Sequence, residues 1–374
     1  MPDDMLPAIP QRTAAWFQVR RGAVTASSAA VWLGMKEPGS SKIFAGHGLS
    51  IFAAKGQGEL QHAFQQLLSA EPNGPSLVRS PFAACAMEMG TIKEADVLLT
   101  YAAYMDATRE YASGYHNNCR KPIAFNTLHI RIKSTWSLSA FQCLQQCWFR
   151  CETLRMHEVG AALLQSIPPD VQQFQPPLVE KLPRIMASCD ALVKDSGTGQ
   201  LVRLVEAKHR FPFAPPARPD GKFTYLGRSR APQKQISCEQ FAQCQMQMLV
   251  MDCKECDLIS FSLGGSRIFH IKREAKWLAI ALQLLEHMQQ NYIALKKQPQ
   301  PDALMTDKPA LYKSFISETV AAMQQLERQN HTEVASAVER SKMTPYFLDK
   351  VSPADASRIQ TGEARPQTLT LAKQ

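Results

Sequence analysis

The sequence has no apolar run long enough to cross a bilayer, which argues against a membrane partner. It opens with neither a secretory apolar core nor an Arg-rich transit segment, so we expect an intracellular protein. Its ten cysteines are then expected to be free thiols of a reducing compartment, either the cytoplasm or the nucleus. Cys253-x-x-Cys256 has no second short-spaced pair to match it, which argues against a zinc site.

The sequence has only a modest excess of basic charge. The 374 residues are 45% apolar, which suffices for a substantial core, and their net charge is +9. This charge favours an anionic partner, with nucleic acid as the leading candidate, but it does not identify that partner.

One stretch, residues 184–209, organises the chain. It predicts two β-strands joined by a turn at 195–199, because an apolar run and a run rich in Val and Leu flank Asp, Ser, Gly, Thr and Gly. Side chains alternate across a strand, so Glu206 and Lys208 are expected on one face. The hairpin is expected to bring Asp190 close to both.

Two carboxylates and an ammonium group on one patch have a chemical use. Carboxylate oxygens hold Mg²⁺, which can activate water and stabilise a leaving oxyanion in phosphodiester cleavage. A lysine can stabilise the developing charge or position the water. The alternative is a surface hairpin with an ordinary Glu/Lys pair, and the pattern taken alone favours that alternative.

Residues 12–34 predict two short helices separated at Gly22. The second helix is expected to begin near Thr25 or Ser27, either of which could be its cap. A helix N-terminus flanked by Arg20 and Ser27 suits a phosphate group. A capped surface helix is the alternative, and the segment by itself favours it.

Hydrophobic periodicity elsewhere predicts an α/β protein. Further helices are expected near 49–54, at 83–111 with Glu94 by its apolar face, at 236–252, at 274–295 and at 309–328. Further strands are expected at 156–164 and as an antiparallel pair over 256–262 and 266–272. In the helix at 236–252, Gln243 and Gln247 lie four residues apart on one side.

Two segments are strongly basic. Residues 116–156 contain six Lys/Arg against Glu152 alone and interrupt the pattern, so we interpret them as an insertion. Residues 203–234 contain eight Lys/Arg with aromatic side chains between them. Such a mixture suits an arm over a nucleic-acid backbone, and a solvated surface loop is an equal alternative.

The motifs in this order resemble those of the lambda-exonuclease/YqaJ-type viral recombinase family, within the PD-(D/E)xK nuclease superfamily. W-F-Q-V-R-R-G-A-V-T-A-S at residues 16–27 resembles the W-x-x-x-R-x-G-x-x-T-A-S opening of that family. Gly90-x-x-x-Glu94 is similar to its G-x-x-x-E helix, and A-S-C-D-A-L, E-A-K and F-A-Q-C-Q-M-Q-M are similar to its later motifs. The resemblance covers roughly residues 12–290 and implies a restriction-endonuclease-like mixed β-sheet core flanked by helices.

The resemblance also implies a metal centre. Asp190 and Glu206 would bind Mg²⁺, for which Mn²⁺ can substitute, and the carbonyl group of Ala207 would assist them. Lys208 would position or activate the attacking water. Glu94 would support the metal site.

Other residues would hold the helix and the DNA. Gln243 would secure the active-site end of its helix. Arg20, Thr25, Ser27 and Ser188 would grip the 5′-phosphate of a DNA end.

The resemblance implies a 5′-to-3′ exonuclease on double-stranded DNA ends that serves recombination or repair. A single-strand annealing partner and a homo-oligomer, a trimer in some members, are expectations of the same kind. Two alternatives stay open: an endonuclease on DNA or RNA, and a non-catalytic nucleic-acid end-binding protein of the same fold.

The expected domain organisation has one main unit. Residues 1–11 form an N-terminal arm, and 12–295 form the exonuclease-like domain with the insertion 116–156. Residues 296–341 form a helical extension. The polar tail 342–374 is expected to be disordered.

Overall fold

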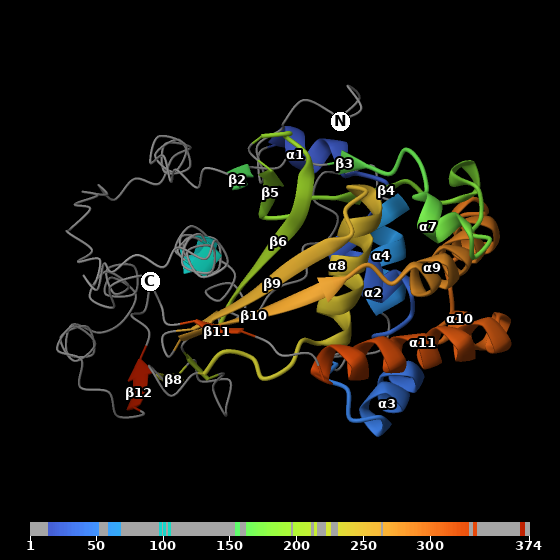
Figure 1. Cartoon of the computed structure of the whole chain (residues 1–374). Coiled ribbons are helices and arrows are strands. Elements are labelled where there is room, and N and C mark those ends of the chain that lie inside the picture. The colour runs from blue at the N-terminus through green and yellow to red at the C-terminus, as the bar shows by residue number, and fades with distance from the viewer. Residues whose placement is uncertain are drawn as a thin grey trace, which may run out of the picture.

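The structure is a computed structural model and is drawn in Figure 1. It describes residues 14–51, 59–68, 97–98, 100–101, 104–105, 154–157, 162–195, 197–210, 213–214, 222–225, 231–262, 265–328, 332–334 and 367–370. The described part is an α/β fold in which helices flank a mixed β-sheet, as the sequence predicts.

The central sheet has six strands in the order β11-β10-β9-β6-β5-β2. Their bounds are β2 Leu154–His157, β5 Ala191–Asp195, β6 Leu201–His209, β9 Glu255–Ser262, β10 Gly265–Lys272 and β11 Thr332–Val334. β6 and β9 are parallel, and the other neighbouring pairs are antiparallel. Parallel neighbours need a crossover connection, and helix α8, Cys238–Val250, lies within the one between β6 and β9.

The hairpin of β5 and β6 is closed by the chemistry of its turn. Asp195 Oδ1 accepts hydrogen bonds from the backbone N–H groups of Gly197 at 3.0 Å and Thr198 at 2.7 Å. Gly199 has a φ of +68°, in the left-handed region that glycine tolerates best. The predicted hairpin and its turn are therefore confirmed.

Helices cover both faces of the central sheet (Figure 1). On the face toward α8, the sheet side chains Leu204 and Leu258 belong to the main hydrophobic core. On the opposite face, Val205 and Ile259 pack with helical residues between 97 and 105. Because side chains alternate along β6 and β9, these strands contribute residues to a hydrophobic core on each face of the sheet.

The N-terminal segment joins the domain through a small second sheet. It contains α1 Ala14–Val19, β1 Val24–Thr25, η1 Ala26–Ser28 and α2 Ala29–Trp32. Gly22 follows α1 with a φ of +65°, which confirms the predicted end of that helix. β1 pairs in parallel with β4, Ile185–Ala187, and β4 pairs with β3, Ala162–Leu163.

The predicted helix at 236–252 is confirmed as α8. It begins with a capping box in which Ser237 Oγ accepts from the backbone N–H of Gln240, while Gln240 Oε1 accepts from the backbone N–H of Ser237. Phe241 then packs on Trp277 of α9, and Trp277 packs on Phe315 of α11, with ring centroids 5.4 Å apart in each pair.

The remaining helices complete the described fold. They are α3 Pro38–Gly46, α4 Glu59–Leu68, α7 Pro169–Gln172, η2 Val179–Lys181, α9 Ala275–Met288, the π-helical η4 Gln289–Ile293, α10 Ala303–Asp307 and α11 Pro309–Arg328. The predictions at 274–295 and 309–328 are confirmed, as is the antiparallel pair β9 and β10. None of the described helices combines the length and apolarity that a bilayer crossing requires.

Several predictions of elements were wrong in detail. The first strand of the organising stretch is two strands in different sheets, β4 and β5. The carbonyl group of Ser188 between them accepts a hydrogen bond from the Gln247 side chain at 2.9 Å instead of continuing a strand ladder. The strand predicted at 156–164 is likewise divided, because β2 pairs with β5 whereas β3 pairs with β4.

Other corrections concern segments expected to be irregular. Residues 49–51 of the helix expected near 49–54 are not helical, and residues 52–54 lie outside the described part. A helix precedes them at α3, where Pro38 occupies the first turn and Phe44 is fully buried. The basic segment 203–234, for which a surface loop was one alternative, contains β7 Phe213–Ala214 and β8 Lys222–Tyr225. Within the tail expected to be disordered, β12 Gln367–Thr370 pairs with β8. Of the predicted insertion, Leu154, Arg155 and Met156 belong to β2, and its other residues lie outside the described part.

Candidate active site

The candidate site lies where the start of β5 and the end of β6 meet α8. Asp190 precedes β5, and its backbone N–H donates to the carbonyl group of Val205 at 3.0 Å. Its carboxylate Oδ2 accepts from the backbone N–H of Ala207 at 2.7 Å. The ladder of the hairpin therefore fixes both the backbone and the side chain of Asp190 beside the Glu206–Lys208 segment.

Glu206 is the most enclosed acid of this site. It is only 4% exposed, and its two oxygens accept from three side chains. Oε1 accepts from Lys208 Nζ at 2.6 Å and from Gln243 Nε2 at 2.7 Å, while Oε2 accepts from Gln247 Nε2 at 2.7 Å. A buried carboxylate needs such compensation, and here it fixes the orientation of the carboxylate plane.

Lys208 projects from the same face of β6 as Glu206, as the alternation of a strand predicts. Its ammonium also donates to Gln243 Oε1 at 3.1 Å. Burial disfavours the charged form, but the carboxylates of Glu206 and Asp190 outweigh this effect and raise the pKa of Lys208 above its ordinary value. The lysine is therefore a cation at neutral pH.

A second cluster, Arg20, Thr25, Ser27 and Ser188, gathers next to the carboxylates. Arg20 donates to Ser188 Oγ at 2.9 Å and to Ser27 Oγ at 3.4 Å, and the Thr25 and Ser27 hydroxyls are 3.1 Å apart. Burial lowers the pKa of Arg20 to about 10, and the nearby Glu206 opposes that effect. The cluster thus combines a cation that stays charged at neutral pH with three hydroxyl groups, a set of donors that suits an anion.

The two clusters are joined at Ser188. Its side chain accepts from Arg20, and its carbonyl group accepts from Gln247, which also donates to Glu206. Sequence reasoning noted that Gln243 and Gln247 share one side of the helix but included only Gln243 among the site residues. The shared side was the available signal, since both amides reach Glu206 from consecutive turns of α8.

The donor set is suited to a hard divalent cation. No group of three or more His, Cys, Asp or Glu side chains that could hold a metal occurs in the described ranges. Mg²⁺ does not require one, because it is often bound by one or two carboxylates together with waters and substrate phosphates. Asp190 and Glu206 fit that pattern. Glu94, the predicted support of the metal site, lies outside the described residues.

A further ionic network lies on the opposite face of the sheet. Asp257 is 1% exposed and accepts from Tyr101 Oη at 2.6 Å and Arg203 Nη1 at 2.9 Å, and its other oxygen lies 2.7 Å from His270 Nδ1. Burial and the adjacent Asp257 raise the pKa of Tyr101. Because these groups satisfy one another, we interpret the network as structural: it ties the helical residues near Tyr101 to the sheet.

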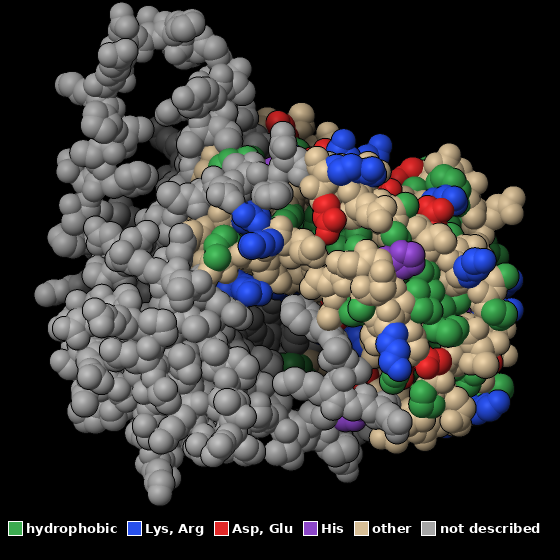
Figure 2. Space-filling model, turned by 90° about the horizontal axis from the view of Figure 1, so that it is seen from below, with side chains coloured by type: hydrophobic (Ala, Val, Ile, Leu, Met, Phe, Trp, Pro, Cys, Tyr) green, Lys and Arg blue, Asp and Glu red, His purple; other side chains and the backbone are tan. Residues whose placement is uncertain are grey.

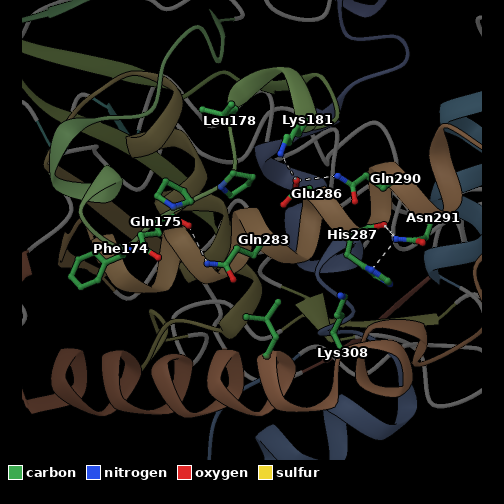
Figure 3. A pocket seen from close by; sticks show the side chains of 13 residues that line it. Phe174, Gln175, Leu178, Lys181, Gln283, Glu286, His287, Gln290, Asn291 and Lys308 are labelled. Carbon is green, nitrogen blue, oxygen red and sulfur yellow. Dashed lines mark hydrogen bonds and ion pairs between the residues drawn. The ribbon is translucent and has the colours of Figure 1, made fainter.

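A cavity of about 510 Å³ lies elsewhere, between the 174–181 segment, α9 and the start of α11 (Figure 3). Its lining includes amide, proline and charged side chains, and the backbone carbonyl group of Gln175 accepts from Gln283 Nε2 at 3.4 Å. None of the predicted site residues lines it. On the face of the molecule in Figure 2, Lys and Arg side chains are dispersed among acidic ones over the described surface.

No family model and no curated protein matches this chain. Among solved structures, it is similar to an alkaline exonuclease (LHK-Exo) from Laribacter hongkongensis, with 16% identity and a TM-score of 0.33, over 84% of this chain and 97% of that one. A function for this chain is therefore inferred from the arrangement of its side chains and not from this similarity.

Proposed function

We propose that this chain is a metal-dependent deoxyribonuclease that hydrolyses phosphodiester bonds from the 5′ ends of double-stranded DNA. One observation supports the proposal above all. The carboxylates of Asp190 and Glu206 lie together with the Lys208 ammonium, which donates to Glu206. Beside them lies the cluster of Arg20 and three hydroxyl groups. The first set suits phosphodiester cleavage, and the second suits a terminal phosphate.

Asp190 and Glu206 would hold Mg²⁺ or Mn²⁺, assisted by the carbonyl group of Ala207. A bound ion of this kind supplies an activated water and stabilises the leaving oxyanion. The protein contributes preorganisation: Ala207 N–H holds one carboxylate, and Gln243 and Gln247 hold the other. These groups need little reorientation when substrate arrives.

Lys208 would act as a cation and not as a base. A lysine side chain has an ordinary pKa of about 10.4, so it is protonated at neutral pH and has no lone pair with which to accept a proton. Its ammonium is held by Glu206 and Gln243. From there it can orient a water oxygen or stabilise negative charge that develops on the phosphate.

Arg20, Thr25, Ser27 and Ser188 would bind the phosphate at the 5′ end of the strand. Arg20 is the only one of these four that carries charge, and a guanidinium matches the geometry of phosphate oxygens. Because Ser188 lies two residues before Asp190, a phosphate bound there would be close to the carboxylates. Cleavage would then begin at the end of the DNA strand, as recombination or end repair requires.

The test uses purified protein, Mg²⁺ and three DNAs: linear duplex with 5′-phosphate ends, the same duplex with 5′-hydroxyl ends, and a covalently closed circle. We expect release of nucleotides from the phosphorylated linear duplex and little or none from the circle. Cleavage of the circle would instead support an endonuclease. Tight binding of ends without cleavage under Mg²⁺ or Mn²⁺ would support a non-catalytic end-binding protein and reject the proposal.

A further inference from the structure

Helix α8 carries three glutamines at alternate positions, and they have different tasks. Gln245 points away from the carboxylates and binds the backbone just before α9. Its Nε2 donates to the carbonyl group of Lys272, and its Oε1 accepts from the backbone N–H of Glu274, both at 2.8 Å. Gln243 contacts Glu206 and Lys208. Gln247 contacts Glu206 and the backbone of Ser188.

Gln247 is fully buried, and its single amide nitrogen makes both contacts. Nε2 lies 2.7 Å from Glu206 Oε2 and 2.9 Å from the Ser188 carbonyl oxygen, so both of its hydrogens are used. Its Oε1 is buried and has no hydrogen-bond partner within the described part of the chain. A buried amide with one orphaned end is costly, so its position is explained better by what the other end holds than by stability.

Ser188 is held from two sides. Gln247 fixes its carbonyl group, and Arg20 fixes its hydroxyl group at 2.9 Å. A continuous path of hydrogen bonds therefore runs from the Glu206 carboxylate through Gln247 and Ser188 to Arg20. Gln247 thus bridges the carboxylate of the proposed metal site and the backbone of the proposed phosphate grip.

We infer that Gln247 is a positioning residue that makes cleavage depend on a terminal 5′-phosphate. This inference rests on the proposed function. A phosphate held by Arg20 and Ser188 places the scissile bond correctly only if Ser188 keeps its distance from Glu206. Loss of the amide leaves Lys208 and Gln243 on Glu206 and leaves Arg20 on Ser188, but it removes the link between the two sets, so the phosphate still binds and no longer aligns the bond.

The experiment compares Gln247→Met with the matched control Gln245→Met. Methionine is similar in length and removes the donor. Steady-state kcat and KM are measured on duplex with 5′-phosphate and with 5′-hydroxyl ends. We expect Gln247→Met to lower kcat on phosphorylated ends by roughly ten- to a hundredfold, with KM within about twofold, so that the phosphate/hydroxyl ratio of kcat falls toward one. The ratio of Gln245→Met should equal that of the wild type.

Gln247→Asn provides a second variant if the methionine is not tolerated in the core. It keeps the amide but is one methylene shorter, so it cannot span both acceptors, and the ratio should fall in the same way. A wild-type ratio in either folded Gln247 variant overturns the inference while the nuclease proposal stands. A wild-type enzyme that cleaves both ends equally also overturns it. A wild-type protein that cleaves neither duplex overturns the nuclease proposal and this inference together.

Discussion

Arg20 donates a hydrogen bond to Ser188 Oγ over 2.9 Å, although 168 positions separate the two residues in the sequence. The contact places the N-terminal segment against the backbone that leads into Asp190. The proposed recognition of a DNA end and the proposed cleavage would thus depend on distant parts of the chain. Two predictions separate these contributions, and two concern the stability of the fold.

Replacement of Asp190 by Asn should abolish most of the cleavage. The amide keeps an oxygen that can accept from Ala207 N–H, so the fold should be retained, but it removes one of two negative ligands. We expect the cleavage rate to fall by at least about a hundredfold. Calorimetry should also show that Mg²⁺ binding is weakened without DNA. Asp195→Asn, in the turn of the same hairpin, is the control. Wild-type Mg²⁺ binding and cleavage in Asp190→Asn would refute the metal-site assignment.

Replacement of Arg20 by Ala should weaken the binding of phosphorylated ends. Arg20 reaches Ser27 and Ser188, whereas the adjacent Arg21 is exposed. Loss of a charge-assisted contact should reduce affinity for 5′-phosphate duplex by roughly tenfold, measured by fluorescence anisotropy in Ca²⁺, with less effect on 5′-hydroxyl duplex. Arg21→Ala should affect both duplexes equally. If the two arginine variants behave alike, the contribution of Arg20 is only general charge.

Replacement of Glu37 by Gln should stabilise the protein at neutral pH. Glu37 is 1% exposed, its Oε1 accepts from the backbone N–H of Leu60, and its Oε2 is buried without a partner among the described residues. Burial, together with the charges of Asp302 and Glu59, raises the pKa of Glu37 above 4.5.

The sign of the effect depends on that shift. Between 4.5 and the raised pKa, the folded state binds more protons than the unfolded state, so its stability falls as the pH rises through that window. Glutamine does not titrate, so the unfolding free energy of Glu37→Gln should exceed that of the wild type by about 1 kcal/mol at pH 7 and by less at pH 4. Urea titrations at both pH values test this. The control is Glu318→Gln, whose carboxylate pairs with Lys276 and is partly exposed. If the unfolding free energies of Glu37→Gln and the wild type differ by the same amount at both pH values, the raised pKa of Glu37 does not explain the difference.

Removal of the Asp257 carboxylate should destabilise the sheet without direct damage to the active site. Asp257→Ala leaves Arg203 and His270 without their buried partner, which should cost about 3 kcal/mol of unfolding free energy in urea. Tyr101→Phe removes only one donor and should cost about 1 kcal/mol. At a temperature where both variants are folded, the phosphate/hydroxyl ratio of cleavage should equal that of the wild type. A changed ratio would show that the network acts on the site.

Local patterns predicted the hairpin because its turn and alternating side chains lie within one short stretch. The same reasoning placed Glu206 and Lys208 on one face and brought Asp190 beside them. Helix α8 and the helices in the C-terminal half were also predicted, since their signal is hydrophobic periodicity. The roles assigned to these residues stay predictions.

What the sequence could not provide depends on distant partners. The break between β4 and β5 lies where Ser188 accepts a hydrogen bond from Gln247, 59 residues away. β12 forms by pairing with β8, which no local pattern indicates. The grouping of Arg20 with Ser188 came from the family resemblance alone, because no rule of spacing connects positions so far apart.

The parallel pairing of β1 with β4 has a consequence for the order of assembly. Val24 lies opposite Ile185, so the first strand must wait until about half of the chain has been synthesised before it can close this loop. The amides that hold Glu206 arrive later still, with α8. A nascent chain that ends before Cys238 therefore carries the hairpin of β5 and β6 without the side-chain amides of Gln243 and Gln247. The proposed activity should therefore appear late in synthesis, after the core that contains α8 has closed.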